Sequence, residues 1–146
     1  MIIFLLFLSN CQTKPKNDIR EYFKNDLKLS ITNNEIYILT PIYDGKCTTA
    51  QNQIGELLMT KSDIQKKTHL IYIGNSKKEL KFISKGLNEK YDVIYDSKNI
   101  AIKKGVIKFQ PIVFIPNIEN DIIYELSTYE SFKKLKNDII NLDEIH

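Results

Sequence analysis

The chain has 146 residues, of which 42% are hydrophobic and 27% are charged, and its formal net charge at pH 7 is +3. These values are typical of one globular domain that buries its own core, and they exclude an intrinsically disordered chain. The lysines are mixed with acidic residues along the whole sequence instead of gathering on one element, which argues against a nucleic-acid binder.

A short apolar segment stands near the amino terminus. Residues 2–8 are apolar without interruption, in a run that is too short to span a bilayer and is typical of the hydrophobic part of a signal peptide. The run leads into Leu8-Ser9-Asn10-Cys11, which resembles the lipobox of bacterial lipoproteins, although Asn10 stands where glycine, alanine or serine is usual. The resemblance implies a lipid on Cys11 and a membrane-anchored, periplasm-facing protein of the cell envelope.

This motif divides the chain into three parts. Residues 1–10 would be the cleaved signal peptide, and residues 11–17, which are polar and contain Pro15, would be a short tether. Residues 18–146 would form one folded domain, because they contain no repeat, no low-complexity tract and no second boundary.

Apolar residues recur with helical spacing directly after the tether. Ile19, Phe23 and Leu27 are four residues apart, so we predict an amphipathic helix that begins at Asn17 or Asp18. Short apolar runs then predict strands at residues 35–40, 70–73, 92–95, 111–115 and 122–126, with a loop at residues 100–108 that turns at Gly105.

Further helices are predicted between the early strands and after the last one. They begin just after Cys47, at a capping signal formed by Ser76 and Glu79, and at a similar signal formed by Ser127 and Glu130. Strands that alternate with helices imply parallel pairing, whereas the last two strands are joined by a hairpin-length connection. The sequence therefore predicts an α/β fold in which a central mixed sheet has helices on both faces.

Cys47 stands at the start of a predicted helix, directly after a strand and a turn. The unpaired N–H groups and the dipole of a helix N-terminus favour a thiolate, so this position would lower the pKa of the thiol and raise its reactivity. Asp44 in the turn would act in the opposite direction if it lay close to the sulfur. If Cys11 carries lipid, Cys47 is the one free thiol of the chain. It is either a reactive thiol or a small, partly buried residue without chemistry.

The order of elements around Cys47 is similar to that of the thioredoxin-like fold. A strand leads into a cysteine at a helix start, and far downstream Gln110-Pro111 opens a strand that is followed by a hairpin and a last helix. The resemblance covers residues 19–142 and implies a three-layer sandwich in which a cis-proline, here Pro111, faces the active-site cysteine. The alternative is that Pro111 simply opens a strand at a sheet edge.

The motif at the cysteine departs from the pattern of this family. Similar lipoproteins of Bacteroidetes-type bacteria carry Cys-x-x-Cys, and the corresponding residues here are Cys47-Thr48-Thr49-Ala50. In this alignment Ala50 replaces the resolving cysteine. A second alignment places Asp44 first and Cys47 second, but it moves the thiol away from the helix start. With a single thiol, a mixed disulfide needs an outside thiol to release it.

Two other kinds of chemistry are not supported. In a one-cysteine peroxidase the positions of Thr40 and Asp44 would hold proline and threonine or serine, and Arg20, the only arginine, lies in the predicted N-terminal helix instead of near the thiol. No zinc motif is present, because His69 and His146 are far apart and no Cys-x-x-Cys exists. We therefore expect no metal or other cofactor, and a structural role for His69 at the start of a strand.

Two functions follow as competing hypotheses. The first is a membrane-tethered envelope protein in which Cys47 acts as a single thiol on thiol-containing protein clients. The second is a binding or scaffolding module that keeps the thioredoxin-like fold without catalysis. A lipoprotein of an unrelated α/β fold is a third interpretation. Tyr43, beside the turn before Cys47, either lines the site or is an ordinary packing residue.

Overall fold

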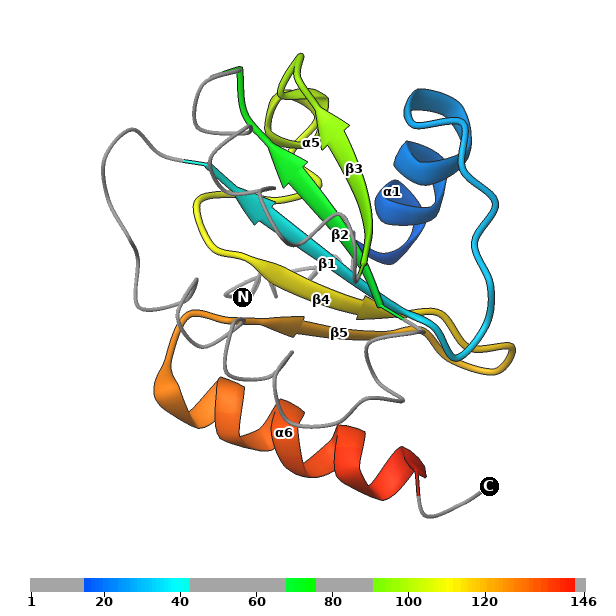
Figure 1. Cartoon of the computed structure of the whole chain (residues 1–146), viewed down its shortest axis with the longest axis vertical. Coiled ribbons are helices and arrows are strands. Elements are labelled where there is room, and N and C mark those ends of the chain that lie inside the picture. Colours follow the sequence, from blue (N-terminus) through cyan, green and yellow to red (C-terminus); the bar gives the residue numbers. More distant parts are fainter. Residues whose placement is uncertain (1–14, 43–67, 76–90, 144–146) are drawn as a thin grey trace, which may run out of the picture.

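The computed structural model describes residues 15–42, 68–75 and 91–143. Their centre is a five-stranded sheet with the strand order β3-β2-β1-β4-β5 (Figure 1). The strands are β1 (Ile36–Pro41), β2 (Thr68–Ile73), β3 (Asp92–Asp96), β4 (Ile112–Ile115) and β5 (Ile122–Glu125). All five were predicted from the sequence, with bounds that differ by one or two residues.

The sheet is mixed. Strands β1, β2 and β3 are parallel, with Ile38 opposite Leu70 and Leu70 opposite Val93. On its other side β1 pairs with β4 in the antiparallel direction, and β4 pairs with β5 through a hairpin. The predicted combination of a parallel part and a closing antiparallel hairpin is therefore confirmed.

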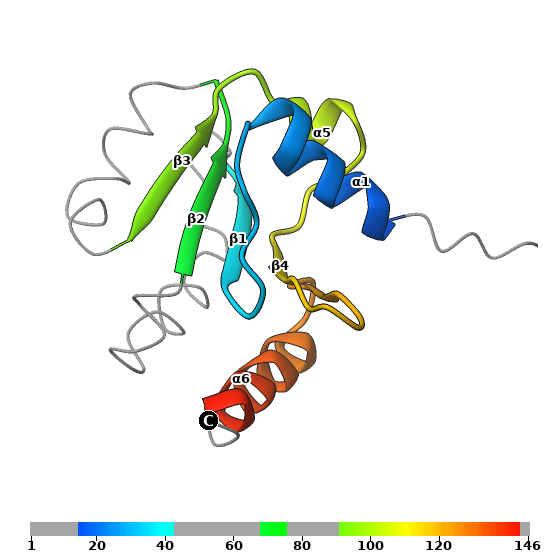
Figure 2. The ribbon, with the colours of Figure 1, turned by 90° about the vertical axis from the view of Figure 1, so that its right-hand side faces the viewer.

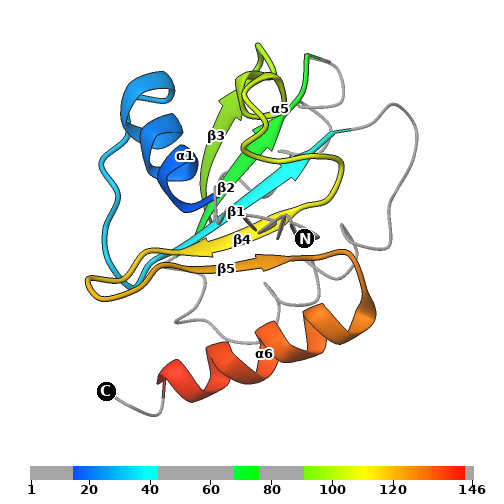
Figure 3. The same ribbon diagram turned by 180° about the vertical axis from the view of Figure 1, so that it is seen from behind.

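Helices cover both faces of this sheet (Figures 2 and 3). On one face lie α1 and the π-helical turn η1 that continues it, together with α5, and on the other lies α6. The helices are α1 (Pro15–Glu21), η1 (Tyr22–Asp26), α5 (Ile100–Lys103) and α6 (Tyr129–Asp143). The α/β class is confirmed, and the layers are compatible with an α/β sandwich.

Alternation along the strands divides the core into two halves. In β1, Ile36 and Ile38 face α6, whereas Tyr37 and Leu39 face α1 and α5. The half under α6 includes Phe132, Leu135 and Ile139, the residues that the sequence assigned to the apolar face of the last helix. The half under α1 is rich in aromatic rings: Tyr22, Phe23, Tyr37 and Phe114.

The first helix ends in a wider turn than the sequence predicts. The Leu27 N–H donates to the Tyr22 carbonyl at 3.1 Å, a five-residue spacing that defines the π-helical turn. The turn allows the neighbouring residues Tyr22 and Phe23 both to be fully buried. Phe23 then lies edge-on to Tyr37, with 5.1 Å between the ring centroids. The regular four-residue spacing had predicted the helix but not this change of register.

The segment predicted as a loop at residues 100–108 begins with the short helix α5, so that part of the prediction is wrong. A strand residue caps this helix: the Asp96 carboxylate accepts the Ala101 N–H at 2.8 Å. A helix of four residues has too little periodicity to be recognised in a sequence. The predicted turn at Gly105 is confirmed, because this residue has a φ of +70°, which favours glycine.

The cap of α6 lies one residue later than predicted. The Ser131 N–H donates to Thr128 Oγ1, and the Thr128 N–H donates to Ser131 Oγ, both at 3.2 Å. This reciprocal pair is a capping box in which serine takes the place usually held by glutamate or glutamine. The predicted pair of Ser127 and Glu130 is therefore wrong, because the helix begins at Tyr129 and Thr128 precedes it.

The Thr128→Ala substitution tests this cap. It removes the oxygen that accepts the Ser131 N–H and should lower the free energy of unfolding by about 1 kcal/mol. Ser127→Ala is the matched control and should change it by less than about 0.5 kcal/mol, as exposed substitutions usually do. Urea denaturation measures both values. A larger effect from Ser127→Ala would restore the cap that the sequence suggested.

Candidate functional site

The two cysteines of the predicted sites, Cys11 and Cys47, lie outside the described residues, as does Tyr43. The segment Cys47-Thr48-Thr49-Ala50 and the predicted helix cap at Ser76 lie outside them as well. Of the predicted site residues, Pro111 is described. The described part of the candidate site is therefore the edge of the sheet where β1 ends, because the chain continues from this edge to residue 47.

Pro111 stands immediately before β4, as predicted, but the peptide bond that precedes it is trans. None of the described residues has a cis peptide bond, so the prediction of a cis-proline is wrong. Pro111 behaves as the strand-opening residue of the alternative interpretation: its carbonyl accepts the Leu126 N–H at 2.9 Å. Because the strand ladder at this position uses the carbonyl, the missing N–H of proline costs nothing.

Thr40 lies beside Pro111 at the end of β1. The register that pairs Leu39 with Ile112 brings Thr40 opposite Pro111, on the face of the sheet that α6 covers. Thr40 is 2% exposed, and its Oγ1 atom is buried without a hydrogen-bond partner among the described residues. A buried hydroxyl without a hydrogen bond lowers the stability of the fold, so its presence needs an explanation. β1 ends at the next residue, Pro41, six residues before Cys47.

At the same edge of the sheet, Asp96 at the end of β3 joins three elements. Its carboxylate accepts the Tyr22 hydroxyl at 3.1 Å as well as the Ala101 N–H. Burial, followed by the nearby charge of Asp96, raises the pKa of Tyr22 far above its usual value, so this hydroxyl stays a donor. Asp96 is 3% exposed, and its Oδ2 atom accepts both hydrogen bonds, so its role is to hold η1 and α5 on the sheet.

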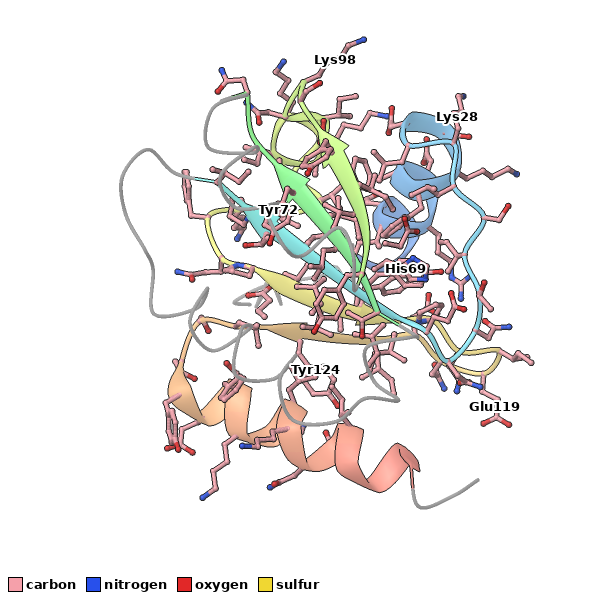
Figure 4. All side chains as sticks on the ribbon, viewed as in Figure 1. Lys28, His69, Tyr72, Lys98, Glu119 and Tyr124 are labelled. Atoms are coloured by element: carbon pink, nitrogen blue, oxygen red, sulfur yellow. The ribbon has the colours of Figure 1, made fainter. Side chains whose placement is uncertain are left out.

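The opposite edge, where the parallel strands begin, carries a charged cluster that the sequence analysis missed. His69 in β2 places Nε2 at 2.8 Å from Glu35 and Nδ1 at 2.9 Å from Asp92, and its ring stacks on Tyr37 with centroids 4.5 Å apart (Figure 4). The Tyr37 hydroxyl also donates to Glu35 at 3.1 Å. The cluster ties together the starts of β1, β2 and β3.

The cluster holds Glu35 in its charged form. Burial acts to raise the pKa of Glu35, but the hydrogen bonds from His69 and Tyr37, the charge of His69 and the hydrogen bond from Thr32 together outweigh it, so the net pKa is lowered. The structural role predicted for His69 agrees with these contacts. A sequence signal existed: residues 35, 69 and 92 each stand near the start of a predicted strand, and parallel strands bring their starts together.

Arg20 locks α1 to the hairpin between β4 and β5. Its Nε donates to Asp121 Oδ2 at 2.6 Å and its Nη2 to Asp121 Oδ1 at 2.5 Å, in the fork geometry that suits a guanidinium. The Asn117 N–H donates to the same carboxylate at 3.1 Å, which closes the tip of the hairpin. The one arginine of the chain therefore binds Asp121 at the hairpin and not the edge of the sheet where β1 ends.

Neither charged cluster of the described residues has the form of a metal site. No group of three His, Cys, Asp or Glu side chains in residues 15–42, 68–75 and 91–143 could hold a metal ion. In the same residues, no helix is long and apolar enough to cross a membrane. Among the described residues, two buried side-chain oxygens have no hydrogen-bond partner: Thr40 Oγ1 beside Pro111 and Asn99 Oδ1 just before α5. Thr40 is the one that lies at the edge from which the chain continues to Cys47.

Comparison of the chain with models of protein families, with curated proteins and with solved structures finds no match. The functional argument therefore depends on the residues themselves and on the order of the elements.

Glu35→Gln tests the charged cluster. A lowered pKa means that the charged carboxylate contributes stability above the ordinary pKa of 4.5, and that this contribution is lost as the pH falls through the lowered value. At pH 7 the variant should lose about 1 kcal/mol of unfolding free energy, because a charge-assisted hydrogen bond to a partly exposed group is replaced by a neutral one. The difference should narrow towards pH 3. The exposed Glu119→Gln is the control and should alter neither value; an equal loss at both pH values would show that the charge of Glu35 is irrelevant.

Proposed function

We propose that this chain is a membrane-tethered, thioredoxin-like protein of the cell envelope, in which Cys47 acts as a single redox thiol on protein clients. The observation that carries the proposal is the edge of the sheet where β1 ends. Pro111 and the unpaired hydroxyl of Thr40 lie side by side there, and the chain continues from that edge to Cys47 within six residues of Pro41.

The sheet supports the choice of family. Strands β2, β1, β4 and β5 are neighbours, β4 is antiparallel to β1, and α6 follows β5. This is the order that the resemblance requires: a strand that leads to the cysteine, a strand opened by proline beside it, a hairpin and a last helix. Strand β3 adds one further parallel strand at the edge.

The Thr40 hydroxyl supports a site at this edge. Natural cores rarely retain an unsatisfied buried donor, and those that do often keep it for function. A hydroxyl here would donate to a thiolate or to the backbone of a client laid along Pro111. Either contact would offset the free-energy cost of burying the Thr40 hydroxyl while a client is bound.

The proposed reaction is thiol–disulfide exchange by a single thiol. The Cys47 thiolate attacks one sulfur of a client disulfide, forms a mixed disulfide and releases the other client sulfur as a thiolate. A second thiolate, from the client or from a small thiol, then attacks the client sulfur of the mixed disulfide. A new disulfide forms between these two sulfurs, the bond to Cys47 breaks, and Cys47 leaves as a thiolate. The electrons come from that second thiol, because Ala50 stands where a dithiol protein has its resolving cysteine.

The membrane tether follows from the lipobox-like residues 8–11. A diacylated Cys11 would hold the domain at the bilayer through the three polar residues 12–14, which precede the start of α1 at Pro15.

A binding module without catalysis is the second candidate. It is favoured by two observations: Ala50 removes the resolving thiol, and the trans peptide bond before Pro111 departs from the geometry that the family resemblance implied. In this case the edge at Thr40 and Pro111 would bind a client segment while Cys47 remained inert.

The pH dependence of Cys47 alkylation separates the two candidates. In the full-length Cys11→Ser chain Cys47 is the sole thiol, so the alkylation rate reports on it alone. A redox site should show a thiolate that titrates well below the ordinary value of about 8.5. Cys11→Ser combined with Cys47→Ser gives the background rate. A thiol that titrates at or above the ordinary value, or reacts only in urea, would leave the binding module as the better account.

Thr40→Val tests the buried hydroxyl. Valine has nearly the same shape but no donor, so the variant should be more stable by about 1 kcal/mol in urea denaturation. If the hydroxyl serves the site, the same variant should also react more slowly at Cys47 or trap fewer clients. Thr128→Val, at an exposed position where the hydroxyl is used as a cap, should instead be destabilised. A loss of stability in Thr40→Val would mean that the hydroxyl is satisfied and has no role to explain.

A further inference from the structure

Helix α1 has a defined direction across the sheet. In the last turn of α1, Arg20 reaches the hairpin between β4 and β5, at the edge where β1 begins, so the helix runs away from the hairpin after this residue. Near the end of η1, Asp26 accepts Lys104 Nζ at 2.7 Å, beyond α5 at the opposite edge. The start of α1 therefore lies on the side of the hairpin, as Figures 1 and 2 also show.

The proposed anchor lies close to this start. Cys11 precedes Pro15 by four residues, and four residues span at most about 14 Å when fully extended. A bilayer that held a lipid on Cys11 would therefore lie near the hairpin edge of the domain. The edge where β1 ends would face away from it.

The tip of the hairpin, residues 116–121, has a composition that suits a lipid interface. Ile118 is 86% exposed, which is the highest exposure among the large apolar residues of the described parts. The tip is fixed to the domain, since the Asn34 N–H donates to the Pro116 carbonyl at 2.9 Å and Asp121 binds Arg20. The other exposed residues of the tip are Glu119 and Asn120, and the exposed amides of Asn33 and Asn34 stand just before β1 at the same edge of the sheet.

Most of the charged side chains at this edge have a partner within the protein. Asp121 is paired with Arg20, and Glu35 and Asp92 both contact His69. Glu119 remains as an exposed acid beside Ile118 and points outward in Figure 4. Paired charges lower the cost of bringing this edge to a bilayer, and one carboxylate can stay among the headgroups while its neighbour inserts.

We propose that the tip of the β4–β5 hairpin contacts the bilayer and that Ile118 inserts into its interface. The contact would orient the domain on its tether, with the edge at Thr40 and Pro111 turned towards the aqueous space. This inference rests on the proposed lipidation of Cys11, because a tip with one apolar residue binds lipid usefully only when an anchor already holds it there.

Tryptophan substitution tests this contact directly, because the chain contains no tryptophan. Ile118→Trp and Phe109→Trp each introduce one reporter at an exposed position, 86% and 71% exposed in the unaltered chain, at opposite ends of β4. The full-length lipidated chain is placed in phosphatidylcholine vesicles with and without bromine on the acyl chains. A side chain about 5–10 Å deep in the interface should lose roughly half of its fluorescence to bromine and shift to the blue, whereas Phe109→Trp should keep nearly all of it.

The result separates the two proposals. Mass spectrometry of Cys11 and flotation of the vesicles show whether the anchor exists. If Cys11 carries lipid and the chain floats, but Ile118→Trp is unquenched or no more quenched than Phe109→Trp, the tip contact is wrong and the anchor stands. If Cys11 carries no lipid and the chain does not float, the anchor and the orientation that depends on it are both wrong.

Discussion

Burial of strand β1 on both faces and along both edges is the constraint on which the structure depends. All six of its residues are buried, and it is the strand at which the parallel part of the sheet meets the antiparallel part. Ile38 contributes to the core under α6 and Leu39 to the core under α1. A strand in this position must be apolar throughout, which leaves Thr40 as an exception inside an otherwise hydrophobic element.

The buried polar and charged residues of the described parts, Thr40, Thr68 and Asp96, lie at or near the ends of strands, at the two edges where the strands begin and end. At the edge where the parallel strands begin, His69 joins two carboxylates. At the other edge, Asp96 satisfies a tyrosine hydroxyl and the start of a short helix. Both clusters complete their own hydrogen bonds and therefore stabilise the fold. Thr40 differs from them because its hydroxyl has no hydrogen-bond partner among the described residues.

The sequence predicted the parts of the fold that depend on local patterns. Apolar runs located all five strands of the sheet, and the spacing of Phe132, Leu135 and Ile139 located the last helix and its buried face. The hairpin was visible in the length of its connection.

What the sequence missed depends on contacts between distant residues. The short helix α5 is capped from β3, and the wide turn after α1 is set by the need to bury Tyr22 together with Phe23. For the candidate site, the position of Pro111 before a strand was right, but its peptide geometry was taken from a family resemblance and was wrong. The unsatisfied hydroxyl of Thr40 is a property of three-dimensional packing, which no pattern of residues reveals.

The two edges of the sheet also give the proposed function its geometry. β1 is six residues long, so its ends are separated by about 20 Å. The proposed anchor near the start of α1 and the proposed reactive edge at the end of β1 would then lie on opposite sides of the domain. A single thiol depends on meeting a second thiol from outside, and tethering raises its effective concentration towards partners at the same membrane. The higher effective concentration helps only if the thiol faces those partners. A fixed orientation of the domain on the membrane would keep the thiol facing them.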